Sequence, residues 1–118
     1  MDLDQSRENA KAMHLLWVEP AEGLPIVARV TAEGVLIYKC PGCNAEHGLA
    51  MKTPSAPAGQ VWRWNGNVAK PTVNPSVMSH ALADRPACQH FMVNGILEFL
   101  PMTTHPLRLQ KVPMLPLE

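Results

Sequence analysis

The chain has 118 residues, with ten basic and ten acidic side chains and a formal net charge of zero. This length fits one domain with a modest core, and the balanced charge provides no large positive surface for nucleic acid. No run reaches the roughly 18 apolar residues that span a bilayer. The polar start, MDLDQSRENAK, lacks the basic and apolar regions of a secretory signal. We therefore expect a cytoplasmic protein without a membrane segment, whose partner is a protein rather than nucleic acid.

The predicted elements are short because 12 prolines and seven glycines interrupt the chain. Residues 6–13 contain good helix formers, and we predict that segment 1–20 is an N-terminal helix or arm. The apolar run 15–18 predicts a first strand. Residues 21–118 are expected to form a single zinc-binding, β-rich domain. It begins with a hairpin of runs 26–30 and 35–38, which a loop ending at Gly34 separates.

Farther along, residues 60–64 alternate in polarity and stop at the turn signal Asn65-Gly66, whereas residues 70–75 are too rich in proline for a central strand. Runs 90–93 and 96–100 flank Asn94-Gly95, a strong hairpin signal because both turn residues need positive φ. The last segment, 107–115, predicts an edge strand and a tail. The sequence thus predicts a mainly β fold: a small zinc-pinned domain of about six short strands with two hairpins.

Three cysteines predict a metal site, because an odd number cannot close a disulfide framework and cytosolic disulfides are rare. Cys40-Pro-Gly-Cys43 lets two thiolates converge on one ion, and Cys88 and His90 supply the other two ligands of a closed zinc site. His47 competes with His90 as the fourth ligand. The alternatives are a redox pair and unliganded buried thiols. A redox pair needs a helix after the motif, whereas residues 41–47 look like a turn.

Several motifs occur together in a fixed order. These are C-P-G-C with His47 downstream, W-R-W-N-G at 62–66, K-P-T-V-N-P-S-V at 70–77, and a cysteine before F-M-V-N-G-I-L-E-F-L at 91–100. Over about residues 38–110 the chain resembles a family of small phage and prophage proteins of unknown function, some of which carry the label ammonia monooxygenase. Relatives occur in bacterial ubiquitin-like conjugation operons, where the resemblance implies a serine peptidase that processes the ubiquitin-like protein.

The resemblance also implies site residues. Ser76 matches the serine of the family's P-S motif and would be the nucleophile, and His105 matches the family histidine and would be the base. His47 is the second choice for the base if His90 binds zinc. Asn65 would donate a hydrogen bond from its side chain to the oxyanion.

Two segments depart from the family pattern. Family members usually have a histidine directly after the cysteine that Cys88 matches, whereas this chain has Gln89 there and His90 one place later. Adjacent residues of a strand point to opposite faces, so the two positions are not equivalent. The segment from Thr104 to Gln110 also lacks the small residues that usually precede the glutamine.

We therefore predict a zinc-stabilised small hydrolase, a serine-type peptidase that acts on a protein tail such as that of a ubiquitin-like protein. A site with four protein ligands has no open position for substrate, so the zinc would be structural. The first alternative is a non-enzymatic, phage-type protein-binding module for a host factor or a defence protein. The second is a zinc-ribbon-like nucleic-acid binder.

Overall fold

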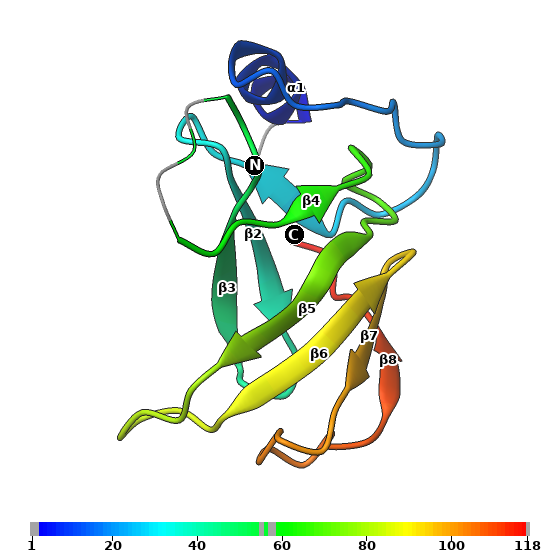
Figure 1. The fold of residues 1–118 in the computed structure, drawn as a ribbon. Helices are drawn as coiled ribbons and strands as arrows, with labels where there is room; N and C mark the ends of the chain where they lie inside the picture. The colour runs from blue at the N-terminus through cyan, green and yellow to red at the C-terminus, as the bar shows by residue number, and fades with distance from the viewer. Residues whose placement is uncertain (1–2, 55, 57–58, 118) are drawn as a thin grey trace.

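The structure, a computed structural model, describes residues 3–54, 56 and 59–117. In these residues it contains one helix and two antiparallel sheets, with strand orders β1-β2-β3 and β4-β5-β6-β7-β8 (Figure 1). The mainly β class agrees with the prediction, although the described residues form eight strands instead of about six. The elements are α1 (Leu3–Ala12), β1 (Ala28–Val30), β2 (Val35–Cys40), β3 (Ala45–Ala50), β4 (Arg63–Trp64), β5 (Val73–Ser79), β6 (Cys88–Val93), β7 (Ile96–Phe99) and β8 (Lys111–Pro113).

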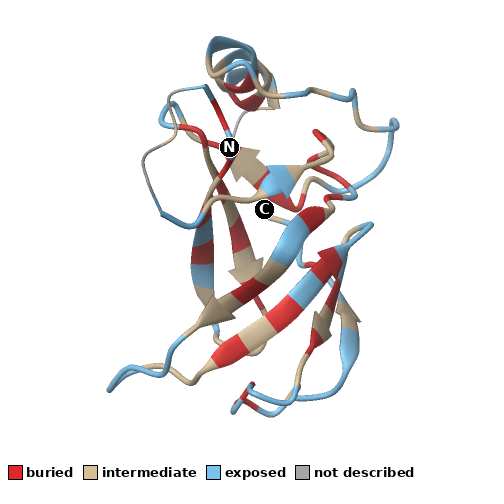
Figure 2. Ribbon diagram, in the orientation of Figure 1, coloured by how far each residue is buried: buried red, intermediate tan, exposed pale blue. Residues whose placement is uncertain are grey.

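The two sheets pack against each other through one face each, and the hydrophobic core lies between them. Burial alternates along β6, where Cys88, His90 and Met92 are buried and the residues between them are more exposed (Figure 2). Tyr38 of β2 reaches across the core, and its hydroxyl lies 2.7 Å from His90 Nε2. The alternation follows from the two-residue period of a strand. We call the core-facing side of the five-stranded sheet its inner face and the opposite side its outer face.

Both predicted hairpins are present. Strand β6 joins β7 through Asn94 and Gly95, whose φ angles of 52° and 78° are the positive values that this turn requires. Strands β1 and β2 pair antiparallel across the loop that ends at Gly34. Strand β8 lies at the edge of the five-stranded sheet, as predicted for the C-terminal segment.

Three local predictions are wrong. Residues 15–18 form no strand, and the chain there leaves Leu16 61% exposed. The predicted turn over 41–47 ends at Asn44, and β3 begins at Ala45 because the chain pairs back along β2. Residues 73–75 belong to β5, which lies between β4 and β6. Pro75 is tolerated there because the β5–β6 register shifts between Val73 and Val77, so the ladder does not need its missing N–H.

Helix α1 is held on β1 by polar contacts and by one core residue. Ser6 Oγ accepts a hydrogen bond of 3.1 Å from the amide of Val30, and Asn9 Nδ2 donates one of 2.9 Å to the carbonyl of Val30. Ala10 is fully buried in the core. The N-terminal segment is therefore a docked helix rather than a loose arm. The described residues include no helix of the length and apolarity that crossing a membrane requires.

Candidate functional site

Four side chains from four places in the fold converge on one point at the end of the inner face. Cys40 is the last residue of β2, Cys43 lies in the following turn, His47 is in β3 and Cys88 begins β6. The turn folds back tightly because Asn44 takes a φ of 55° and its amide donates to the carbonyl of Cys40. Local chain reversal thus brings three of these side chains together, and the packing of the two sheets brings the fourth.

The spacing of these side chains fits a tetrahedral metal ion. One ligand atom from each of the four residues lies within 4.8 Å of all the others. The sulfurs of Cys40 and Cys88 are 3.8 Å apart, and a tetrahedron with metal–sulfur bonds of about 2.3 Å has an edge of about 3.8 Å. The Nε2 atom of His47 is buried without a hydrogen-bond partner. Because a buried polar atom is rarely left unpaired, this atom indicates a missing partner such as a metal ion.

The electrostatics of the three thiols also favour a cation. Hydrogen bonding with Cys88 lowers the pKa of Cys40 to about 3, and the same pairing raises the pKa of Cys88 far above its usual range. Burial, together with the charge on Cys40, raises the pKa of Cys43 to about 11. Without a cation, ionisation of one of these thiols therefore opposes ionisation of the other two. A bound metal ion would let all three ionise.

His90, the favoured fourth ligand in the sequence prediction, is not part of this group of four. Its ring is fully buried, with Nδ1 3.3 Å from Cys88 Sγ and Nε2 2.7 Å from the Tyr38 hydroxyl. Burial lowers its pKa to about 4, so the ring is neutral at physiological pH. A neutral ring can accept a hydrogen bond from the Tyr38 hydroxyl at Nε2 and donate one from Nδ1–H to Cys88 Sγ. The structure thus groups His47 with the three cysteines and places His90 behind one of them.

Ser76 lies in β5 on the other side of the sheet from the cluster. It precedes Val77, whose buried side chain points to the core, and adjacent residues of an extended strand point to opposite faces. The side chain of Ser76 is half-buried, and its carbonyl accepts a hydrogen bond of 3.3 Å from Trp62 Nε1. In the part of the chain that the structure describes, no hydrogen bond reaches Ser76 Oγ.

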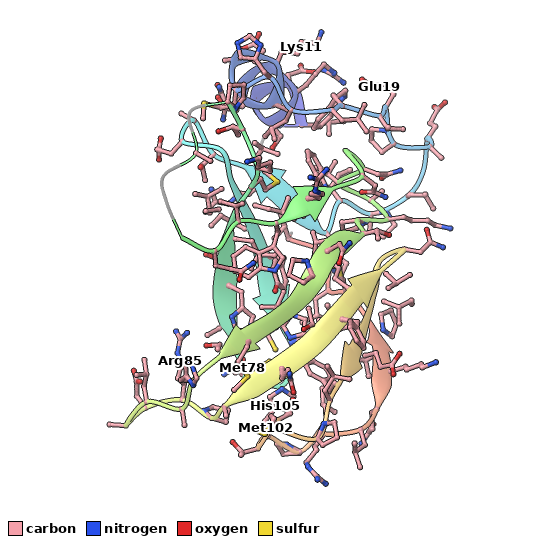
Figure 3. The ribbon with its side chains drawn as sticks, in the orientation of Figure 1. Lys11, Glu19, Met78, Arg85, Met102 and His105 are labelled. Carbon is pink, nitrogen blue, oxygen red and sulfur yellow. The ribbon has the colours of Figure 1, made fainter. Side chains whose placement is uncertain are left out.

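The predicted bases are engaged elsewhere. His105 is 4% exposed and lies beside β6, with Nε2 3.5 Å from Cys88 Sγ (Figure 3). Its Nδ1 accepts a hydrogen bond of 3.2 Å from the amide of Leu107. His47 belongs to the group of four potential ligands. The structure therefore brings both histidines to the metal cluster and brings neither to Ser76.

Asn65, the predicted oxyanion donor, shapes a turn. Its Oδ1 accepts hydrogen bonds from the amides of Asn67 and Thr72, and its Nδ2 donates to the carbonyl of Lys70. These three contacts close the loop between β4 and β5. They engage both polar atoms of the Asn65 side chain with backbone groups of that loop.

The outer face around Ser76 carries glutamine and apolar side chains. Gln89 pairs with Met78, and both alternate with buried residues, so both lie on the outer face with Ser76. Three apolar residues continue this face over β6 and β7: Phe91, Val93 and Ile96 are 43%, 56% and 38% exposed.

Sequence reasoning missed the residues that surround the cluster. Tyr38 was assigned only to a strand, and Thr103 received no role, although its hydroxyl accepts from the amide of Gln89 and donates to the carbonyl of Gln89. The sequence does contain a signal for Thr103. Thr103-Thr104-His105 follows a predicted strand, and threonine side chains often form hydrogen bonds with backbone groups. The contact of Tyr38 with His90 joins positions 52 residues apart and leaves no local trace.

Fold and cluster together define a class: a small β domain of two packed sheets with four Cys and His side chains close enough to hold a metal ion. Within that class, the chain belongs to the family described as bacterial ubiquitination-like system serine protease (BubE), whose model matches residues 10–100. The resemblance to relatives from ubiquitin-like conjugation operons is thereby confirmed. No curated protein and no solved structure gives a significant match to the chain.

Proposed function

We propose that this protein is a serine-type peptidase that cleaves the tail of a ubiquitin-like protein, with Ser76 as nucleophile. The observation that carries the proposal is the family match, which includes Ser76 and the whole cluster. In the reaction, Ser76 Oγ attacks the scissile carbonyl carbon, its proton passes to the leaving amine, and water hydrolyses the resulting ester.

The edge of β5 supports an extended tail as the substrate. Strand β4 pairs with Val73 and Asn74, and among the described residues no strand pairs with Val77 to Ser79 on that side of β5. An extended peptide can add to such an edge through main-chain hydrogen bonds. Ser76 lies where the paired part of β5 ends and the unpaired part begins, so a peptide docked there would pass its hydroxyl.

We infer that the cluster binds one structural zinc ion through Cys40, Cys43, His47 and Cys88. Three thiolates and an imidazole form a ligand set that zinc prefers, and four protein ligands close its coordination sphere. When bound, the ion neutralises thiolate charge and cross-links the two sheets. Metal analysis of the purified protein should give about one zinc per chain, and a metal-free protein that is fully folded would contradict this assignment.

A second candidate is a non-enzymatic module that binds the same kind of protein without cleaving it. The nucleophile needs a proton acceptor at Oγ, and the histidines predicted for this role lie at the cluster on the inner face. Gln89 instead shares the outer face with Ser76, next to the exposed apolar residues Phe91, Val93 and Ile96. These observations favour binding on this face with or without hydrolysis.

A serine-directed fluorophosphonate probe separates the two candidates. A peptidase is expected to be labelled at Ser76, and Ser76→Ala should abolish the labelling. Ser79→Ala is the matched control, because Ser79 lies on the same strand and pairs with Cys88 on the inner face. The peptidase proposal would be rejected if folded wild-type protein stays unlabelled and also fails to cleave a ubiquitin-like protein with a C-terminal extension, as measured by mass spectrometry. If that protein still binds Ser76→Ala but no longer binds Phe91→Asp, the non-enzymatic binding module is established.

A further inference from the structure

The segment after β7 returns to the metal cluster and is fastened beside it by two threonines. Thr103 is 1% exposed, and its hydroxyl makes hydrogen bonds of 2.9 and 2.8 Å to the amide and carbonyl of Gln89. The amide of Thr104 donates to the carbonyl of Ala87, and its hydroxyl accepts from the amide of Ala87. The residues on both sides of Cys88 are thus tied to this segment, and the next residue, His105, is carried to the thiol itself.

The hydrogen bonds of His105 determine where its ring proton lies. Nδ1 accepts the amide proton of Leu107 at 3.2 Å, so a neutral ring carries its own proton on Nε2. Nε2 lies 3.5 Å from Cys88 Sγ. This N–H therefore points at the sulfur and can donate to it when the sulfur is a thiolate.

Packing fixes the ring in this position. Phe99 contacts the ring edge to face, with centroids 4.5 Å apart. On the other side lies Gly42 of the C-P-G-C turn, where an added Cβ would stand 2.1 Å from the imidazole. The ring fills the space that a side chain at position 42 would need, so any residue larger than glycine there would displace the His105 ring.

We propose that His105 is a positioning residue of the metal cluster, which donates its Nε2–H to the metal-bound thiolate of Cys88 and holds segment 100–107 over the C-P-G-C turn. This inference rests on the metal site of the proposed function and is independent of whether Ser76 is catalytic. The hydrogen bond withdraws charge from the sulfur, so it makes the thiolate less nucleophilic and holds it in place for the metal. Partners of this kind typically contribute about 10- to 100-fold to metal affinity.

His105→Phe keeps an aromatic ring between Gly42 and Phe99 and removes the donor, whereas His105→Gln keeps an amide donor near the position of Nε2. In the zinc-loaded protein, the chelator concentration that removes half of the zinc should be about 10-fold or more lower in His105→Phe and near wild type in His105→Gln. His105→Gln is thus the matched control for the donor. With cobalt in place of zinc, the thiolate-to-metal charge-transfer band should shift in His105→Phe alone.

A folded His105→Phe variant that keeps its zinc at the same chelator concentrations as wild type and has an unchanged cobalt spectrum would overturn the proposal. A wild-type protein that binds no metal would overturn it together with the metal site, whereas failure of the fluorophosphonate probe would leave it standing. The proposed hydrogen bond can also be tested in the wild-type protein. The ¹⁵N shifts of the His105 ring in the zinc-loaded protein should report a proton on Nε2, and a ring protonated on Nδ1 would reject the proposed bond.

Discussion

Two histidines near the cysteines have different partners, and this difference decides which one is available to a metal ion. His90 uses both ring nitrogens, one toward the Tyr38 hydroxyl and one toward Cys88 Sγ. His47 has a buried Nε2 without a partner. A ligand must present a free lone pair, and of these two histidines His47 has the ring nitrogen that is not already engaged.

We therefore expect His47→Ala and His90→Ala to separate metal binding from core packing. His47→Ala should lose zinc to a competing chelator at concentrations that leave wild type loaded, because one of four ligands is gone. His90→Ala should still bind one zinc per chain, while the empty space and the unpaired Tyr38 hydroxyl lower the free energy of unfolding by roughly 2–4 kcal/mol. Zinc stoichiometry after chelator challenge and urea unfolding measure the two effects. The reverse pattern would assign the fourth ligand to His90.

A second residue-scale prediction concerns Gln89, which stands where the family usually has histidine. Met78 pairs with Gln89, and Ser76 lies two residues before Met78 on the same outer face. Ser76 and Gln89 are therefore diagonal neighbours, with roughly 7–8 Å or less between their Cβ atoms. An imidazole at 89 could reach the Ser76 hydroxyl as a base. Gln89→His should raise the rate of fluorophosphonate labelling about 10-fold or more.

The double variant Gln89→His with Ser76→Ala is the control and should remain unlabelled. His90 does not compensate for the loss, because it faces the core from the neighbouring position. An unchanged labelling rate in a folded Gln89→His protein would show that position 89 does not serve Ser76.

Among the secondary-structure elements, helix α1 depends on a few buried polar contacts rather than on an extensive apolar face. Ser6→Ala removes the side-chain acceptor of the buried Val30 amide, and an unsatisfied buried donor costs about 1–3 kcal/mol. The melting temperature should fall accordingly. Gln5→Ala is the matched control on an exposed turn of the same helix and should change the free energy of unfolding by about 0.5 kcal/mol or less. Equal effects of the two substitutions would show that the helix is held otherwise.

The elements that could be predicted are those with local signals. Asn94-Gly95 specifies its turn through positive φ, so the β6–β7 hairpin follows from the sequence. Strand β3 could not be predicted, because AEHGLA has neither a β-branched run nor strict alternation and is a strand only because β2 lies beside it. Strand β5 was excluded because of Pro75, and only the register shift against β6 makes room for that residue.

The same distinction applies to the candidate site. Cys40 and Cys43 could be predicted from their spacing and Cys88 from ligand count. That His47 and not His90 joins the group of four potential ligands could not, since it depends on which histidine meets Tyr38 across the core. The proposed role of His105 depends on Thr103, whose hydroxyl fastens this segment to Gln89, and on Gly42, which leaves room for the His105 ring.

At the scale of the whole molecule, the cluster lies between the two sheets, where a bound metal ion would cross-link them. Cys40, Cys43 and His47 belong to the three-stranded sheet and its turn, whereas Cys88 begins the central part of the five-stranded sheet. The two sheets have separate strand ladders. The direct contacts between them include side-chain packing, the Tyr38–His90 pair, and backbone hydrogen bonds that join Ala50 and Lys52 to Trp62, just before β4. A metal ion adds a bond network that neither sheet can form alone.

Removal of the metal should therefore weaken the packing of one sheet on the other. A ligand at a free concentration 1,000 times its Kd stabilises the folded state by about 4 kcal/mol, so chelation should shift the urea midpoint to markedly lower concentration, and added zinc should restore it. Cys88→Ser should reproduce the chelated midpoint and respond little to zinc, because it removes the only ligand from the five-stranded sheet in the group of four. Ser79→Ala, on the neighbouring strand, should behave as wild type. A midpoint that chelator does not move would mean that the packing and hydrogen bonds between the sheets hold them together without a metal ion.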